Sequence, residues 1–286
     1  MDNKSLKAKK LISGFRLGEG PVYMDELSTL FWIDIKGTAL HSLQLETKKR
    51  SYYPLSDAIG AVMPYSKEIV ICLIGDSLCY LNIASGKIEK KVTLITDPTM
   101  RFNDAKCDQY GNIWAGAMKR IKGADLAGSG SLYCIKDDKI VNEYKGFSIP
   151  NGLDWVNGYF YHIETEEHTI YQYTVENEIN LTHKEKFLTM KERPDGMTKD
   201  SLGNFYVAFW DSGKAIKIAA GTKEITPLLT TDTTHSSCLC FGGKDFKTIF
   251  ITSAEEEEGL KNGALYSIQS EIPGVAPYKY KSSFAR

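Results

Sequence analysis

Four oxygen-bearing side chains occupy corresponding places along the sequence. Glu19, Asn103, Asn151 and Asp195 each stand 10 to 13 residues before the middle of a short apolar run. Two carboxylates and two amide carbonyls make an all-oxygen set, which suits a hard divalent cation: Ca²⁺ first, then Mg²⁺ or Mn²⁺, with Zn²⁺ as a further alternative. Asp and Asn beside Gly or Pro are also ordinary turn residues, but Glu19 is a poor turn former, so the shared spacing favours a site.

The chemistry that such a site supports is hydrolysis. A divalent cation in a pocket polarises a carbonyl and stabilises oxyanion charge, as ester or lactone hydrolysis requires. Because calcium acidifies bound water far less than zinc does, a neighbouring carboxylate should act as the base, and we predict Asp195. Arg101 lies two residues before Asn103, on the same face of an extended segment, where its guanidinium could bind substrate hydroxyls or a carboxylate. The alternative for Arg101 is a solvated charge at the rim.

Other catalytic signatures are absent from the sequence. It contains no G-x-S-x-G, G-x-G-x-x-G, P-loop or H-E-x-x-H motif. The five histidines lack metal-ligand spacing: we expect His162, inside an apolar strand, to be a core residue, and His235, near a turn, is not included in the predicted site. The six cysteines are predicted to be small buried hydrophobes rather than a disulfide framework.

The elements that must position the candidate residues are short strands in a long repeat. Six runs with aromatic or β-branched centres have their middle residues at positions 32, 71, 114, 161, 206 and 250. A period of about 45 residues built of short strands is typical of a propeller blade, with one four-stranded sheet per repeat. The sequence therefore predicts an all-β fold, a six-bladed β-propeller in which residues 1–286 form a single domain. Equivalent positions in a closed ring point at its axis, so the four side chains should converge there.

The two ends of the sequence should complete the last blade. Six repeats counted from the first apolar run leave residues 1–17 over, and the segment after Ser253 supplies only part of a blade, ending in the strand-like run Gly263–Ile268. We predict that a strand near Lys9–Ser13 pairs with this blade, because closing the ring removes open sheet edges.

Composition limits the partners and the compartment. Of the 286 residues, 42% are hydrophobic, which is enough for a large core, and the formal net charge is −1 with acids and bases mixed, which argues against nucleic acid. No stretch reaches the roughly 18 apolar residues of a membrane span. The basic N-terminus lacks the apolar segment of a signal peptide, so we expect a cytoplasmic protein whose partner is a small molecule.

Six segments, in order over nearly the whole chain, carry a family resemblance: Gly18–Pro21, Arg101–Asp104, Asn151–Trp155, Pro194–Met197, Ser236–Gly243 and Gly274–Tyr278. They resemble the regucalcin and gluconolactonase family, which includes senescence marker protein and luciferin-regenerating enzyme. The resemblance implies a six-bladed propeller that holds one divalent metal through Glu19, Asn151 and Asp195. It also implies substrate contacts from Arg101 and Asn103, Asp195 as the base, and hydrolysis of sugar lactones as the usual activity.

Two departures from the family pattern bear on the substrate. Tyr161-His162-Ile163-Glu164-Thr165 stands where relatives often have Tyr-x-x-Asp-Ser/Thr, and the longer Glu164 could alter polarity near the pocket. Lys119-Arg120-Ile121-Lys122 stands where some relatives carry acidic residues in a lid-like loop. A basic rim there would favour an anionic or phosphorylated ligand. The alternative is that these residues only solvate the loop.

The residues support three functions. The first is a metal-dependent lactonase, a carboxylic ester hydrolase that opens sugar lactones. The second is a Ca²⁺- or small-molecule-binding regulatory propeller without turnover. The third is a hydrolase of non-sugar lactones or other esters, because a metal in a funnel is chemically permissive. The candidate base Asp195 favours turnover, since a pure binding site needs no base.

Overall fold

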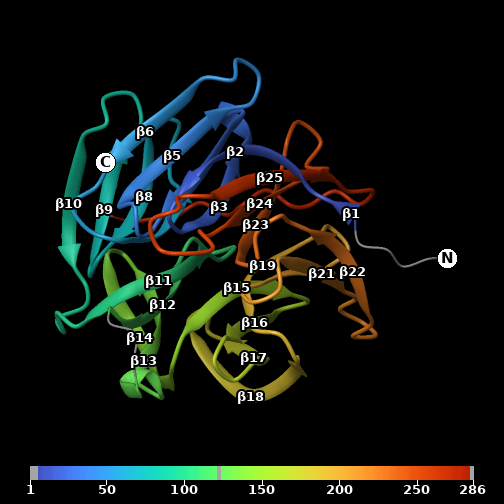
Figure 1. Cartoon of the computed structure of the whole chain (residues 1–286). Helices are drawn as coiled ribbons and strands as arrows, with labels where there is room; N and C mark the ends of the chain where they lie inside the picture. Colours follow the sequence, from blue (N-terminus) through green and yellow to red (C-terminus); the bar gives the residue numbers. More distant parts are fainter. Residues whose placement is uncertain (1–5, 121–123, 284–286) are drawn as a thin grey trace.

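The chain forms a ring of six β-sheets around a central channel (Figure 1). The computed structural model describes residues 6–120 and 124–283. Helix among these residues is confined to two three-residue 3-10 turns, η1 (Asp25–Leu27) and η2 (Ala124–Leu126). The predicted all-β, six-bladed propeller is confirmed.

Each blade is an antiparallel sheet whose strands follow one another from the channel outward. Blade 1 contains β3 (Gly18–Met24), β4 (Thr29–Asp34), β5 (Ala39–Gln44) and β6 (Arg50–Pro54). Blade 2 contains β7 (Ile59–Pro64), β8 (Ile69–Ile74), β9 (Ser77–Asn82) and β10 (Ile88–Thr93). Blade 3 contains β11 (Met100–Cys107), β12 (Ile113–Lys119), β13 (Gly130–Lys136) and β14 (Lys139–Phe147).

The second half of the ring repeats this plan. Blade 4 contains β15 (Pro150–Val156), β16 (Tyr159–Glu164), β17 (Thr169–Glu176) and β18 (Asn180–Thr189). Blade 5 contains β19 (Pro194–Lys199), β20 (Phe205–Phe209), β21 (Lys214–Ile218) and β22 (Ile225–Thr230). Blade 6 contains β23 (Ser236–Gly242), β24 (Thr248–Ser253) and β25 (Gly263–Gln269), and its fourth strand is β2 (Lys9–Phe15).

The N-terminal segment closes the ring. β2 pairs antiparallel with β25, so that Lys9 faces Ser267 and Phe15 faces Gly263. This confirms the predicted pairing of the segment near Lys9–Ser13 with the last blade. The two-residue strand β1 (Leu6–Lys7) lies parallel to β22 in the neighbouring blade 5, so the N-terminal segment joins two blades.

The hydrophobic core is divided among the six junctions between blades. Six buried clusters each combine side chains of two adjacent blades. The second strand of each blade is packed on both faces, which explains the apolar runs of the sequence. Trp32, Trp114, Phe160 and Phe205 in these strands are fully buried.

The polar segments around Glu19, Asn103, Asn151 and Asp195 lie in the innermost strands rather than in turns. Each of them contains a register shift against the next strand, as between Asn151 and Leu153 in β15. Their glycines serve close approach of neighbouring blades. A Cβ on Gly152 would lie 2.7 Å from the carbonyl oxygen of Asp195, and one on Gly196 would lie 2.3 Å from Sγ of Cys238. Inner strands at this spacing require glycine.

The C-terminal segment 273–281 crosses the far end of the channel, and we call it the strap. Val275, Ala276, Pro277 and Tyr278 lie over the channel, with anchors on both sides. The anchoring hydrogen bonds are Ser201 N–H to Pro273 O (2.9 Å), Tyr280 N–H to Pro64 O (2.9 Å), Lys281 N–H to Gly111 O (3.0 Å) and the Tyr280 hydroxyl to Asp138 Oδ1 (2.6 Å). The strap therefore closes one end of the channel.

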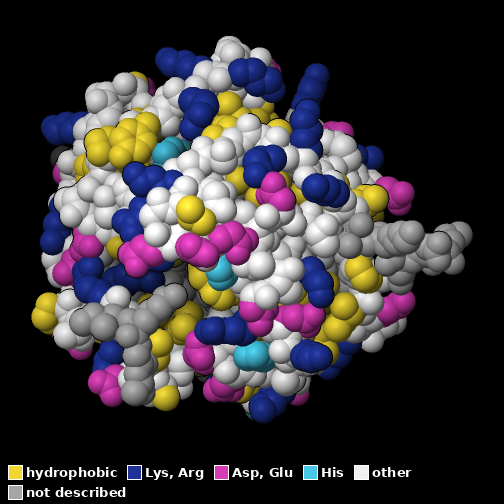
Figure 2. Space-filling model, viewed as in Figure 1, with side chains coloured by type: hydrophobic (Ala, Val, Ile, Leu, Met, Phe, Trp, Pro, Cys, Tyr) yellow, Lys and Arg dark blue, Asp and Glu magenta, His cyan; other side chains and the backbone are white. Residues whose placement is uncertain are grey.

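Charged side chains of both signs are interspersed over the face shown in Figure 2. This pattern agrees with the formal net charge of −1. Within residues 6–120 and 124–283, no helix has the length and apolar character needed to cross a membrane.

Candidate functional site

The candidate residues meet in one cavity of about 260 Å³ at the end of the channel away from the strap. We call it the site cavity. Glu19, Arg101, Asn151 and Asp195 are each the second residue of an innermost strand, β3, β11, β15 and β19, and all four line it together with Asn103. The register of the repeat therefore brings the five predicted residues together from four blades.

Blades 2 and 6 contribute no oxygen ligand at the corresponding position. The second residue of β7 is Gly60, where a Cβ would lie 2.7 Å from backbone atoms of Phe102. The second residue of β23 is Ser237, whose hydroxyl donates to the carbonyl oxygen of Gly18 at 2.6 Å. Packing between blades occupies both positions.

Glu19 is buried next to other acids. Its side chain accepts a hydrogen bond from the backbone N–H of Gly20 at 2.6 Å. Burial raises the pKa of Glu19 well above its ordinary value, and the neighbouring charges of Asp195 and Asp104 raise it further. Asp104 lies behind this pair, and burial raises its pKa to about 6. The acids are thus held where a cation would stabilise their charged forms.

The two asparagines differ in how their amides are used. Asn151 donates from Nδ2 to Oγ1 of Thr165 at 3.1 Å, and Thr165 donates in turn to the carbonyl oxygen of Pro194 at 2.8 Å. This orientation leaves the carbonyl oxygen of Asn151 for the cavity. Asn103 donates to the carbonyl oxygen of Pro150 at 3.1 Å, and its own Oδ1 accepts from Arg101 Nη1 at 3.1 Å. Asn151 is therefore the better candidate for a metal ligand, and Asn103 for a substrate contact.

Arg101 lies inside the cavity wall rather than on a solvated rim. Its guanidinium donates to the carbonyl oxygen of Phe102 at 2.8 Å and lies 3.5 Å from Sδ of Met118. Burial, with a smaller contribution from Arg120, lowers the pKa of Arg101 to about 10, so it stays protonated at neutral pH. A buried cation beside Asn103 can bind hydroxyl or carboxylate oxygens.

The donor set of the site cavity fits a hard cation. Glu19 and Asp195 supply carboxylates and Asn151 supplies an amide oxygen, and such ligands suit Ca²⁺ or Mg²⁺. Within the described ranges, no three His, Cys, Asp or Glu side chains are grouped so as to hold a metal on their own. The amide oxygen is therefore an essential part of the predicted set.

Four lining residues with polar or aromatic side chains were not predicted from the sequence: Thr165, Glu166, Arg193 and Trp210. The side chain of Arg193 forms an ion pair with Glu166. The backbone carbonyl oxygen of Arg193 accepts a hydrogen bond from the backbone N–H of Trp210 at 3.0 Å. Thr165 and Trp210 directly follow the second strands of blades 4 and 5, and Ile35, which also lines the cavity, follows that of blade 1. Alignment of the repeats one residue past each apolar strand would have found Thr165 and Trp210.

Neither departure from the family pattern places a described side chain in the lining of the site cavity. Glu164 does not line the site cavity: its buried carboxylate accepts the backbone N–H groups of Ser148 at 3.1 Å and Ile149 at 2.9 Å. Arg120 is paired with Asp57 at 2.8 Å and lies outside the cavity lining, as does Lys119. Residues 121–123, which include Lys122, lie outside the described part of the chain.

The histidine and cysteine expectations are largely met. His162 is fully buried, its pKa lowered to about 3 by burial, but both ring nitrogens lack hydrogen-bond partners among the described residues. His235 does not line the cavity, although its ring lies 4.7 Å from that of Trp210. All six cysteines are buried, and each is a free thiol.

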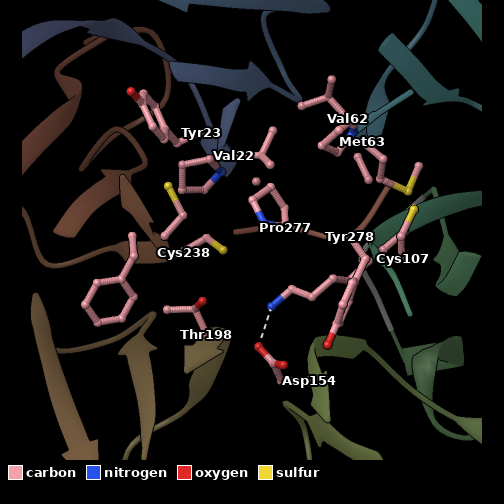
Figure 3. A pocket seen from close by; sticks show the side chains of 18 of the residues that line it. Val22, Tyr23, Val62, Met63, Cys107, Asp154, Thr198, Cys238, Pro277 and Tyr278 are labelled. Carbon is pink, nitrogen blue, oxygen red and sulfur yellow. Dashed lines mark hydrogen bonds and ion pairs between the residues drawn. The ribbon is translucent and has the colours of Figure 1, made fainter. Parts of the chain in front are cut away.

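A second cavity of about 90 Å³ occupies the strap end of the channel, and we call it the far cavity (Figure 3). Pro277 and Tyr278 of the strap lie among side chains of the inner strands in this view. Four charged residues line it, and Asp154 is paired with two of them: Nζ of Lys106 lies 2.8 Å from its Oδ2, and Nζ of Lys199 lies 3.2 Å from its Oδ1. The fourth is Asp104. Burial would raise the pKa of Asp154, but the two ammonium groups outweigh it and hold the pKa below its ordinary value.

Solved structures share this architecture over nearly the whole chain. A luciferin-regenerating enzyme superposes with a TM-score of 0.88 at 24% identity, covering 96% of this chain and 99% of that one. A protein described as calcium-binding, regucalcin from Agrobacterium tumefaciens, also gives a TM-score of 0.88, at 22% identity and with coverage of 97% and 99%. At these identities the likeness establishes the fold.

Sequence relatives extend the comparison. A Bacillus subtilis protein named provisionally as a sugar lactone lactonase, YvrE, is 31% identical over 92% of this chain and 94% of its own length. Pentonolactonase XacC of Haloferax volcanii is 28% identical with the same two coverages. Human regucalcin is 28% identical over 93% of this chain and 95% of its own. The model of the SMP-30/gluconolactonase/LRE-like region matches residues 17–255, so the chain belongs to this family.

Proposed function

We propose that this protein is a divalent-metal-dependent hydrolase that opens sugar lactones. The observation that supports this proposal is the convergence of Glu19, Asn151 and Asp195 with Arg101 and Asn103 on one cavity. Two relatives whose names describe lactonases match more than nine-tenths of the chain and agree with this function.

Each of the five predicted site residues has a proposed role. Glu19, Asn151 and Asp195 would hold the cation, and when bound it would polarise the lactone carbonyl and stabilise the negative charge on its oxygen. Arg101 and Asn103 bind the sugar hydroxyls and orient the ring. Asp195 accepts a proton from the attacking water, whose oxygen bonds to the carbonyl carbon. The carbon–oxygen bond of the ring then breaks, and the ring oxygen leaves as a hydroxyl group by taking up the proton that Asp195 had accepted, beside the new carboxyl group.

The test is a panel of lactones run with metal-free protein and with Ca²⁺, Mg²⁺, Mn²⁺ or Zn²⁺ added separately. We expect hydrolysis of sugar lactones that depends on a stoichiometric divalent ion and is lost with a chelator. Undiminished hydrolysis by the metal-free protein would contradict the mechanism, and hydrolysis of non-sugar lactones or simple esters alone would contradict the substrate class.

A binding propeller without turnover is the second candidate, because several relatives are named regucalcin and one solved relative is described as calcium-binding. The same experiment separates the two functions. Tight Ca²⁺ binding by calorimetry, with no hydrolysis of any lactone in the panel, would favour the second candidate.

A further inference from the structure

With a divalent cation bound, the site cavity would have more positive charge than a neutral sugar lactone requires. Three carboxylates and two guanidinium groups line it, those of Glu19, Asp195, Glu166, Arg101 and Arg193. A divalent cation would compensate Glu19 and Asp195, and Glu166 already pairs with Arg193. Arg101 then remains as a positive charge in the wall without a carboxylate at ion-pair distance among the described residues. The loaded cavity therefore suits an anion.

Arg193 is the residue that can meet this anion. It directly precedes Pro194 and Asp195, and its side chain is 34% exposed, so it stands at the rim on the blade 5 side. Arg101 lines the cavity from blade 3, on the other side of blade 4. Both arginines can thus contact one ligand that lies along the blade 4 wall.

The pairing of Arg193 with Glu166 leaves the arginine incompletely bonded. Its Nε is buried and has no hydrogen-bond partner within the described residues. A buried donor without an acceptor is costly, and a guanidinium binds a carboxylate or phosphate through two parallel hydrogen bonds more completely. The side chain of Glu166 is 40% exposed, so it can give way to a ligand anion.

The wall beside Arg193 is fixed. The hydrogen bond from the N–H of Trp210 to the carbonyl of Arg193 ties the two residues together, and the ring of His235 packs against Trp210. Trp210 offers an apolar surface for the sugar ring, while Arg193 offers the charge next to it. Ring and anionic group of one ligand can therefore be bound side by side.

We propose that Arg193 is a specificity-determining residue that selects sugar lactones carrying an anionic group, a carboxylate or a phosphate, away from the lactone carbonyl. Glu166 occupies the guanidinium in the absence of ligand and is displaced by that group. The proposal rests on the proposed lactonase function, and it assigns a positive charge at the rim of the site cavity to Arg193.

The test compares kcat/KM for matched pairs of lactones that differ in charge. D-glucaro-γ-lactone against D-glucono-γ-lactone tests a carboxylate, and 6-phospho-D-glucono-δ-lactone against D-glucono-δ-lactone tests a phosphate. The readout is the ratio of anionic to neutral kcat/KM. We expect a ratio above one for the wild type in at least one pair, and its fall by about tenfold or more in Arg193→Gln. We expect Arg193→Lys to retain part of the preference, because lysine keeps the positive charge but lacks the two parallel N–H donors of the guanidinium.

Two further variants sharpen the test. Glu166→Gln removes the competing carboxylate, so the ratio should rise several-fold. Arg16→Gln is the matched control: Arg16 is 32% exposed, pairs with Glu255 and Glu258, and does not line the cavity, so the ratio should stay as in the wild type. An unchanged ratio in Arg193→Gln, or a lower ratio in Glu166→Gln, would overturn the proposal.

Binding without turnover separates this proposal from the lactonase function. Calorimetry with the open-chain acids D-glucarate and D-gluconate measures the preference for the second anionic group directly. Tighter binding of glucarate that is lost in Arg193→Gln would support the charge preference even if no lactone were hydrolysed. Lactone hydrolysis with equal binding of the two acids would leave the lactonase function standing and overturn the role of Arg193.

Discussion

The site cavity and the far cavity lie at opposite ends of the same inner strands, but Glu19 in the first and Asp154 in the second differ in the charges that surround their carboxylates. In the far cavity the ammonium groups of Lys106 and Lys199 hold the pKa of Asp154 below its ordinary value. In the site cavity the pKa of Glu19 is raised by burial and by the charge of Asp195. The protein compensates the charge of Asp154 with its own side chains, whereas the charged form of Glu19 would be stabilised by a bound cation.

This difference separates structural from functional polarity within one channel. A fully paired buried network contributes to folding and offers little to a ligand, whereas acids with raised pKa values gain most from a bound cation. The strap adds to the contrast because it covers the far cavity and leaves the other end of the channel uncovered.

Asp195→Asn should give the largest effect on the functional side. It removes a charged ligand and the proposed base together, so we expect kcat to fall by roughly 10²- to 10⁴-fold and the bound metal to decrease. Steady-state kinetics and metal analysis of the purified variant measure both. Full metal content with full kcat in this variant would contradict the two roles, and Glu19→Gln, whose activity should partly return at high metal concentration, serves as the comparison.

Asp154→Asn should give the largest effect on the structural side. It leaves the ammonium groups of Lys106 and Lys199 without their anion, at a cost of about 3 kcal/mol in the free energy of unfolding. For a chain of this size, Tm should fall by on the order of 5 °C, with kcat nearly unchanged. Asp57→Asn is the control, because the pair of Asp57 with Arg120 is partly exposed and should be worth less than about 1 kcal/mol. Equal losses in the two variants would remove the distinction.

Asp104 lines the far cavity, and its charge also raises the pKa of Glu19 in the site cavity, so it makes the comparison sensitive to pH. Its pKa is about 6 in the folded protein against an ordinary 3.8, so the folded state holds this proton more tightly than the unfolded chain. Stability of the metal-free protein should therefore fall as pH rises from about 4 to about 6, by up to roughly 3 kcal/mol from this group. Urea unfolding with a chelator present measures it, and the fall should be smaller in Asp104→Asn. Parallel curves for wild type and variant would argue against a raised pKa.

Thr165→Val tests a smaller effect, the orientation of Asn151. Loss of the hydrogen bond from Asn151 Nδ2 should cost about 1 kcal/mol and weaken metal binding by roughly fivefold. Thr169→Val is the control: its hydroxyl donates to the carbonyl of Glu167 at 2.8 Å outside the cavity, so it should affect stability but not metal affinity. Calorimetric metal titrations distinguish the two variants, and equal affinities would show that Thr165 does not orient the ligand.

Residue spacing predicts the fold and the convergence of the site because both follow from the repeat. The period of the apolar strands defines the blades, and the shared register puts Glu19, Asn151 and Asp195 at one end of the channel. The pairing of Lys9–Phe15 with β25 could also be predicted, because an open ring would leave unpaired edges.

Hydrogen bonds that form only in the folded blades decide what the sequence could not predict. Asn103 and Asn151 have similar places in the sequence but make different hydrogen bonds. The side-chain carbonyl oxygen of Asn103 accepts from Arg101, whereas the side-chain N–H of Asn151 donates to Thr165. Glu164 was considered for the pocket because it stands where relatives often have Asp, yet it accepts hydrogen bonds from backbone N–H groups 15 and 16 residues earlier in the chain. Residue spacing does not specify these hydrogen bonds, because they depend on how the side chains are arranged in the folded blade.

The pairing of β2 with β25 also has a consequence for protein synthesis. It joins residues 9–15 to residues 263–269, so the first strand of the pair leaves the ribosome long before the second. A contact so distant along the chain closes slowly, and until it forms both strands present unpaired edges. Translation that stalls before β25 would therefore release a chain whose earlier blades can be complete but whose ring cannot close, and such chains are prone to aggregate.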